Sequence, residues 1–95
     1  MDDQQIIQLY WQRSQEAIAA TAERYGAYCR AIARNILGSP EDTEECVNDA
    51  YLALWNAIPP QRPPVLRAFL GKVVRNLAFN RWDWDRAEKR GGGET

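Results

Sequence analysis

The sequence predicts an all-α protein, a compact bundle of three to four helices. Apolar residues recur at steps of three or four through most of the 95 residues, which is the spacing of helices with one buried face. Proline and glycine gather at three breaks, 38–40, 59–64 and 91–93. No stretch alternates apolar and polar residues as a half-buried strand does, so no sheet is expected.

Size and composition fit one domain, which we expect over residues 1–90, with a Gly-rich linker or tail beginning at 91–95. Apolar residues make up 45% and charged residues 26%, as is usual for folded proteins. Cys29 and Cys46 lie within apolar helical patterns and are interpreted as reduced core residues. The sequence has no histidine and no Cys-x-x-Cys pair, so no metal site and no cofactor is expected. A leader pattern and a run of about 18 apolar residues are both lacking, which predicts a cytoplasmic protein without a membrane partner.

The first helical pattern covers roughly residues 3–37. Its apolar face is formed by Ile6, Ile7, Leu9, Tyr10, Ile18, Ala22, Tyr25, Cys29, Ile32, Ala33 and Ile36. A break is expected near 12–14, where Ser14 is a candidate cap for a second helix. Gly38 is expected to end the segment.

A new helix is expected to start at Ser39. Serine is a preferred N-cap, Pro40 fits the first helical position, and the acids that follow favour the positive end of the helix dipole. The expected inward stripe is Cys46 or Val47, Ala50, Tyr51, Leu54, Trp55 and Ile58. The proline-rich run 59–64 should stop this helix and form a stiff connection, because each proline fixes φ and disfavours helix before it.

The last helix is expected to run from about Pro64 to about residue 88. Its apolar stripe, centred near Val73, is Leu66, Phe69, Leu70, Val73 and Leu77. The side facing away from this stripe carries Lys72, Arg75, Phe79 and Trp82, with Arg67 and Arg81 on its flanks.

Charge is distributed unevenly along the chain. Residues 1–60 hold four Arg and nine acids, whereas residues 61–95 hold eight Lys or Arg and four acids. A face that combines cations and rings suits nucleic acid with unstacked bases, because cations hold phosphates and rings replace base stacking. Asp83 and Asp85 place negative charge beside this face. Two roles stay open for Phe79 and Trp82: stacking on bases, or packing in the core against the first helix.

The acidic helix that begins at Ser39 needs another kind of partner, because its carboxylates would repel phosphates. An acidic face with an amide and one apolar residue suits a basic protein surface. The residues concerned are Glu41, Asp42, Glu44, Glu45, Asn48, Asp49 and Leu52. The alternative, stabilisation of the helix dipole, accounts for the first four acids and poorly for Asp49.

Two stretches, "YGAYCRAIARNILGSPEDTEECVNDAYLALWNAI" and "FLGKVVRNLAFNRW", together resemble region 2 of bacterial RNA polymerase sigma factors, in particular sigma-70 family members of the extracytoplasmic-function (ECF) type. The resemblance covers roughly residues 25–82. Its specificity lies in the order of the motifs: a Gly-x-Pro-Glu-Asp turn, an acidic helix ending in Leu-x-Leu-Trp, and a Val-x-Arg-Asn-Leu-Ala helix.

The resemblance implies a non-enzymatic transcription initiation domain that docks on RNA polymerase core and recognises and melts the promoter -10 element. In the family, the acidic helix binds the clamp helices of the largest polymerase subunit. This implies a polymerase-binding set of Glu44, Glu45, Asn48, Asp49 and Leu52. The last helix and the loop before it bind the non-template strand as single-stranded DNA. This implies a DNA-binding set of Arg62, Arg67, Lys72, Arg75, Asn76, Phe79, Asn80, Arg81 and Trp82.

The resemblance also implies a possible further partner and a second domain. Family members are often held by an anti-sigma factor, which is a possible partner here. The second helical domain that reads the -35 element in such factors (region 4) is expected to lie outside these 95 residues.

The sequence departs from the family in four places. The base-capturing loop is usually longer and contains Phe, Arg and Gly, whereas residues 59–64 are mostly proline. Asn48 stands where Gln is usual, and the stretch 82–85, "WDWD", stands where Arg-rich sequence is common. Phe69 occupies a position that is commonly Trp.

A second interpretation is a helical protein-interaction module that binds an acidic partner or an anti-sigma-like regulator without melting DNA. An enzyme is the least supported class, because the sequence has no histidine, no Gly-rich phosphate loop and no nucleophile beside a base.

Overall fold

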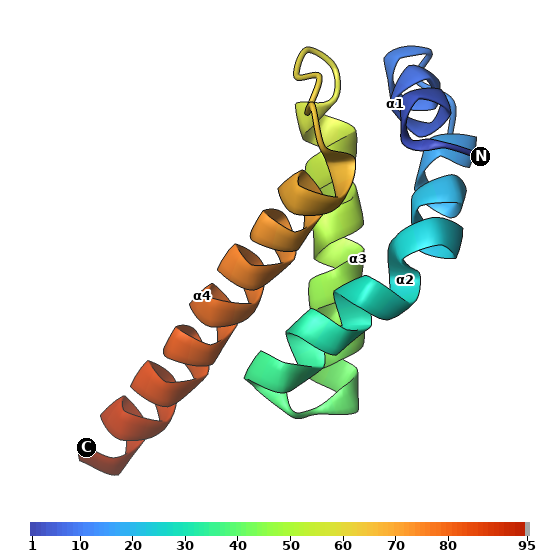
Figure 1. Cartoon of the computed structure of the whole chain (residues 1–95). Coiled ribbons are helices and arrows are strands. Elements are labelled where there is room, and N and C mark those ends of the chain that lie inside the picture. The colour runs from blue at the N-terminus through green and yellow to red at the C-terminus, as the bar shows by residue number, and fades with distance from the viewer. Residues whose placement is uncertain (95) are drawn as a thin grey trace.

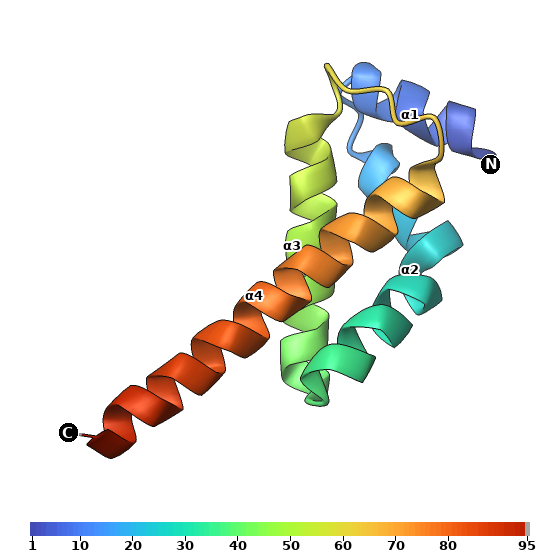
Figure 2. The same cartoon turned by 60° about the vertical axis from the view of Figure 1, so that its left-hand side comes forward.

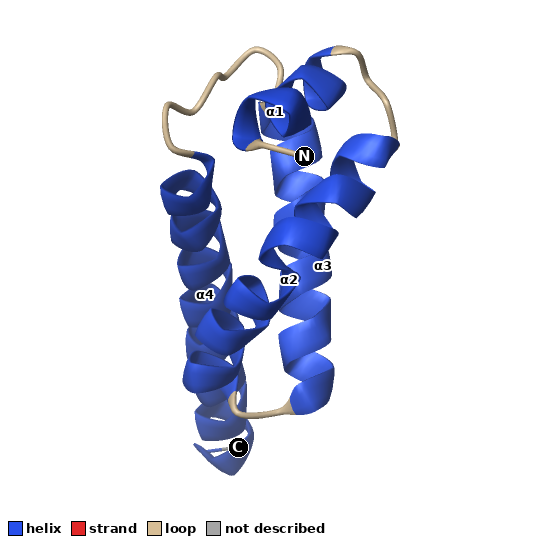
Figure 3. Cartoon of the chain, turned by 45° about the vertical axis from the view of Figure 1, so that its right-hand side comes forward, coloured by secondary structure: helices blue, strands red, loops and turns tan. Residues whose placement is uncertain are grey.

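The computed structural model describes residues 1–94, and side chains within residues 1–86. It contains four helices, α1 (Asp3–Trp11), α2 (Glu16–Leu37), α3 (Pro40–Ala57) and α4 (Leu66–Glu94). Helix is the only regular structure in this part of the chain (Figure 3). The predicted all-α bundle is confirmed.

Three helices, α2, α3 and α4, pack against one another, and α1 lies across one end of them (Figure 1). The connection between α3 and α4 runs over that same end, beside α1 (Figure 2). At the other end α4 extends beyond α2 and α3, so the molecule measures 51 × 24 × 21 Å. The bundle therefore leaves one long side of α4 without a neighbouring helix.

The helix boundaries follow from local capping. Ser39 Oγ accepts a hydrogen bond from the Asp42 N–H at 3.3 Å, and Pro40 is the first residue of α3, as predicted. The expected break between the first two helices is also confirmed. Ser14 Oγ accepts from the Glu16 N–H at 3.3 Å, although Gln15 is the residue that directly flanks α2.

The core receives buried side chains from all four helices. The fully buried residues include Tyr10, Leu54, Leu70 and Val74. Tyr10 Oη donates to Thr21 Oγ1 at 2.7 Å, since the Thr21 hydroxyl itself donates to the Ala17 carbonyl at 2.8 Å. This hydrogen bond ties α1 to α2 without leaving the buried phenol unsatisfied.

Both cysteines are free and buried, as expected. Burial raises the pKa of the Cys29 thiol to about 11. Burial also raises the pKa of Cys46, whose Sγ lies 3.7 Å from the Val74 carbonyl oxygen. Both groups are therefore thiols at neutral pH and act as small apolar core residues.

The inward face of α4 differs from the expected stripe. Leu66, Leu70, Val74 and Ala78 are buried, whereas Phe69, Val73 and Leu77 are only partly buried. The centre at Val73 is wrong because α4 packs against both α2 and α3, which turns Val74 and Ala78 inward as well. Helix α4 also continues past the expected end near residue 88 and reaches Glu94.

Gly71 of α4 packs closely against the Tyr28 side chain of α2. A Cβ at this position would overlap Tyr28 Oη, and the Tyr28 ring is itself covered by Arg67, whose Cζ lies 4.6 Å from the ring centroid. Overpacking of this kind costs about 1–3 kcal/mol, partly offset by the ~1 kcal/mol helix preference of alanine over glycine.

We therefore expect Gly71→Ala to lower the free energy of unfolding by about 1 kcal/mol, measured by urea denaturation. The same change in a Tyr28→Phe background should cost less, because the overlapping hydroxyl is gone. An equal cost in both backgrounds would contradict this account of the contact.

Candidate nucleic-acid and polymerase interfaces

The side of α4 that faces away from the bundle carries cations, an amide and aromatic rings in one line. We call Lys72, Arg75, Asn76, Phe79 and Trp82 the α4 outer face; all five are exposed. Phe79 is 50% exposed and Trp82 38%, so the alternative role of these rings as core residues is wrong. Steps of three and four place their side chains next to one another along the helix.

Arg86 extends the α4 outer face by one turn. Its Cζ lies 4.4 Å from the centroid of the Trp82 ring, within the range of a cation–π contact. Sequence reasoning missed Arg86, although its spacing of four residues from Trp82 was the available signal. Arg86 also adds a positive charge three residues from Asp83, on the neighbouring turn of the helix.

A shallow apolar groove lies at the start of the α4 outer face. It has a volume of about 330 Å³ and is lined by Pro63, Pro64, Val65, Ala68, Phe69 and Lys72. Val65 is 56% exposed, so its apolar side chain is available to a ligand at this groove. Sequence reasoning also missed Val65 and Ala68, although they precede Lys72 at helical spacing. The groove joins the end of the proline-rich connection to the cations of α4.

Two other cations predicted to bind DNA rest on aromatic rings from neighbouring helices. Arg67 stacks on Tyr28 of α2, and the Cζ of Arg62 lies 4.2 Å from the ring centroid of Trp11 in α1. Both arginines remain exposed, so their donors face solvent. Asn80 is exposed one position from Phe79. Asn80 is therefore beside the α4 outer face, whereas Arg62 and Arg67 are held against α1 and α2.

Arg81 turns toward α3. One of its guanidinium nitrogens, Nη2, forms ion pairs with Asp42, at 3.0 Å, and with Glu45. Burial works against the charged form, but the two carboxylates outweigh it, so the pKa of Arg81 is raised. The structure thus places this predicted DNA-binding residue between the two helices, apart from the α4 outer face.

The acidic surface predicted to bind polymerase is the exposed side of α3. Glu44, Glu45, Asn48, Asp49 and Leu52 are all exposed, and we call them the α3 acidic face. Leu52 is 55% exposed and lies among polar side chains. Of the three acids, Glu45 is engaged with Arg81, whereas no ion pair joins Glu44 or Asp49 to a residue within 1–86.

The family profile described as Sigma-70 region 2 matches residues 21–87, well over half of the chain. The chain belongs to the sigma-70 region 2 family. At the level of this family, the domain binds RNA polymerase and recognises the promoter -10 element, and it is a transcription initiation factor with no enzymatic role. No curated protein and no solved structure matches the chain.

The matched segment of this sigma-70 region 2 domain contains α3, most of α2, and α4 through its outer face. Helix α1 and the first turn of α2 precede it. Both candidate interfaces therefore lie within the part that defines the family, while the helix that crosses the end of the bundle does not.

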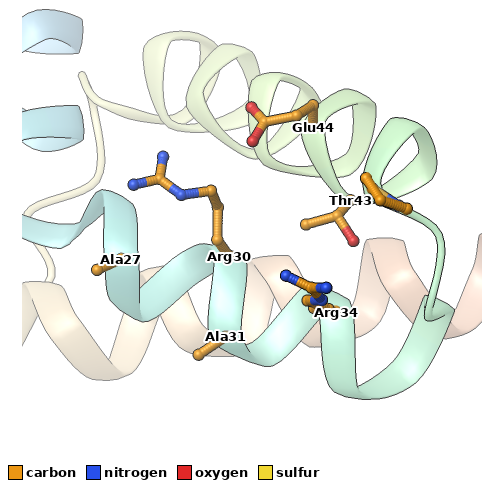
Figure 4. Close-up of a pocket in the computed structure, with 7 residues that line it drawn as sticks. Ala27, Arg30, Ala31, Arg34, Thr43 and Glu44 are labelled. Carbon is orange, nitrogen blue, oxygen red and sulfur yellow. The ribbon is translucent and has the colours of Figure 1, made fainter.

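A second hollow of the sigma domain lies between α2 and α3 (Figure 4). It has a volume of about 330 Å³ and is lined by Ala27, Arg30, Ala31, Arg34, Pro40, Thr43 and Glu44. Arg30 and Arg34 project from successive turns of α2 along the side that faces α3. Because Glu44 belongs to both this hollow and the α3 acidic face, the two surfaces are continuous.

Neither a metal centre nor a membrane span is seen in the described part of the sigma domain. Within residues 1–86, no three His, Cys, Asp or Glu side chains gather as metal ligands would. None of the four helices, as far as they are described, is long and apolar enough to cross a bilayer.

Proposed function

We propose that this domain docks on RNA polymerase core through the α3 acidic face and melts the -10 element through the α4 outer face, as an ECF-type factor in the cytoplasm. The observation that carries the proposal is the exposure of Phe79 and Trp82 in line with Lys72 and Arg75. A solvated charged face needs no exposed rings, whereas an opened DNA strand offers both phosphates and unstacked bases.

Melting costs a few kcal/mol for each base step that is unstacked. On the α4 outer face, contacts between bases and rings recover about 1–3 kcal/mol per base. Lys72 and Arg75 add phosphate contacts, and the Asn76 amide can both donate to and accept from a base edge. These terms favour the single-stranded form of the non-template strand over the duplex.

The apolar groove between Pro63 and Lys72 is the proposed site for one base turned out of the stack. Its walls are apolar, and the Phe69 ring is only partly covered. Lys72 lies at the groove and also on the α4 outer face, so a nucleotide whose base enters the groove keeps its phosphate near a cation. The short proline-rich connection would thus serve as the wall of the site rather than as a flexible capturing loop.

Docking on polymerase is assigned to the α3 acidic face. Carboxylates at its rim would orient the domain on the basic clamp helices, and Leu52 would be buried at its centre. An anti-sigma factor that covers this face would compete directly with polymerase. The two surfaces lie on different helices, so one domain can hold protein and DNA together.

The test is the salt dependence of DNA binding. Single-stranded 12-mers would be selected from a random pool with the 95-residue chain, and the affinity of the selected sequence measured from low to high salt. Each phosphate contact on a single strand contributes about 0.7 to the slope of log K against log salt. The variant Lys72→Ala/Arg75→Ala should therefore lose about 1.4 of that slope.

The matched control is Arg30→Ala/Arg34→Ala, which removes the same charge from α2. It should leave the slope unchanged. Equal binding of all sequences in the pool, or an equal loss of slope in both variants, would instead favour the acidic-partner module, because a phosphate field alone carries no base information.

A further inference from the structure

Helix α1 contacts the connection between α3 and α4 through Arg13, which directly follows the last turn of α1. Arg13 Nη1 donates hydrogen bonds to the carbonyl oxygens of Trp55, at 2.9 Å, and Ile58, at 2.8 Å. The Arg13 guanidinium also lies over the Trp55 ring, with Cζ 3.8 Å from the centroid. These contacts span more than 40 residues of sequence, and Arg13 itself precedes the segment that the family profile matches.

The contacts of Arg13 complete the end of α3. The last carbonyls of a helix have no partner within the helix and need one from elsewhere. Leu54 O accepts from the Ile58 N–H at 2.9 Å, and Ala57 O accepts from the Gln61 N–H at 3.0 Å. Arg13 supplies donors for Trp55 and Ile58, and its positive charge suits the negative end of the helix dipole.

The backbone of Arg13 is strained in the conformation that places its side chain at the end of α3. Its φ is 57°, in the left-handed region that favours glycine. The Ser14 N–H bonds to Leu9 O and the Arg13 N–H to Tyr10 O, both at 3.0 Å, which is the Schellman ending of a helix. Glycine would satisfy that ending without strain, so arginine here is explained by what its side chain does.

A second contact lies farther along the connection. The Arg62 guanidinium stacks on the Trp11 ring, and Pro63 beside it is buried. Helix α1 therefore holds the connection at its start, through Ile58, and in its middle, through Arg62. The next residues, Pro64 and Val65, line the apolar groove.

We propose that α1 is a brace that fixes the 58–65 connection, and that Arg13 is the positioning residue through which it acts. The connection supplies one wall of the groove that is proposed to receive a base. The brace would thus set the spacing between that wall and Lys72. Its consequence for DNA rests on the proposed function, whereas its hold on the connection does not.

The test is Arg13→Gly, a change that removes the guanidinium and relieves the backbone strain, so the fold is kept. Amide exchange followed by NMR should show the N–H groups of Ile58 and Gln61 exchanging about tenfold faster, since hydrogen bonds to a charged donor are among the stronger ones. Affinity for the selected single-stranded 12-mer should fall about tenfold, with binding to the polymerase clamp helices unchanged.

The control is Arg24→Ala, which removes an arginine of α2 that contacts the N-terminal end of α1. Arg24 pairs with Asp3 at 3.0 Å and has no contact with the connection. It should leave exchange at Ile58 and Gln61 as in the wild type. Unchanged exchange in Arg13→Gly would overturn the brace, and faster exchange with unchanged DNA affinity would overturn its positioning role. Failure of the wild-type chain to bind any 12-mer would instead overturn the proposed function.

Discussion

Replacing both Phe79 and Trp82 with alanine is expected to weaken binding of the selected single-stranded DNA by about 30-fold or more. Each ring that stacks on a base contributes about 1–3 kcal/mol, so two rings account for roughly 2–6 kcal/mol. Both side chains are substantially exposed, so the free energy of unfolding should change by only about 0.5 kcal/mol. Fluorescence anisotropy with the 12-mer and urea denaturation measure the two quantities.

Trp84 provides the matched control for this variant. It is 63% exposed and two residues from Trp82, which places it on another side of α4. Trp84→Ala should leave DNA affinity within about twofold of the wild type, because it removes a ring from outside the α4 outer face. If Trp84→Ala weakened binding as much as the double variant, the assignment of DNA to this face would be wrong.

The variant Asp49→Lys/Leu52→Glu should reduce affinity for polymerase clamp helices by about 100-fold. Close charge pairs across an interface couple by about 1.5 kcal/mol or more, and reversing a charge replaces attraction with repulsion. Glutamate at position 52 adds the cost of burying a charge at the centre of the contact. These positions are chosen because Glu45 is paired with Arg81, so its reversal would also disturb the packing of α4 on α3.

Glu23→Lys, which reverses a charge on the exposed surface of α2, is the control for docking. It should bind the clamp helices as the wild type does, and both variants should bind the single-stranded 12-mer with unchanged affinity. Wild-type docking by Asp49→Lys/Leu52→Glu would remove the α3 acidic face from the mechanism. Binding can be followed by calorimetry with the isolated clamp-helix fragment of the polymerase.

The helices could be predicted from sequence because their signals are local. Ser39 and Pro40 mark the start of α3 within one turn, and the proline-rich run marks its end. The exact inward face of α4 could not be predicted in this way. Apolar spacing gives the direction of the buried face only to within about one residue, or 100° around the helix. Val74 became central rather than Val73 because α4 has neighbours on two sides, which is a property of the assembled bundle.

The candidate sites likewise combine features that local sequence predicts with features that only the packed structure determines. Spacing alone put Lys72, Arg75, Phe79 and Trp82 on one side of a helix. Whether the two rings are exposed or packed on the first helix depends on where the other helices lie, so spacing alone left both roles open. The pairing of Arg81 with Asp42, and that of Arg13 with the end of α3, join residues about 40 positions apart. Contacts at such separations are set by packing, so no local pattern indicated that either arginine was already engaged.

The part of α4 that extends beyond α2 and α3 can act as a lever arm. Its last buried side chain among the described residues is Ala78, and Arg81, about one turn farther on, still holds the helix to α3 through its two ion pairs. The C-terminal end of α4 continues past the bundle (Figure 2). At a rise of 1.5 Å per residue, a tilt of roughly 8° at Arg81 displaces position 86 by about 1 Å. Arg86 therefore gains reach along a strand, while the groove near Lys72 stays fixed to the body of the domain.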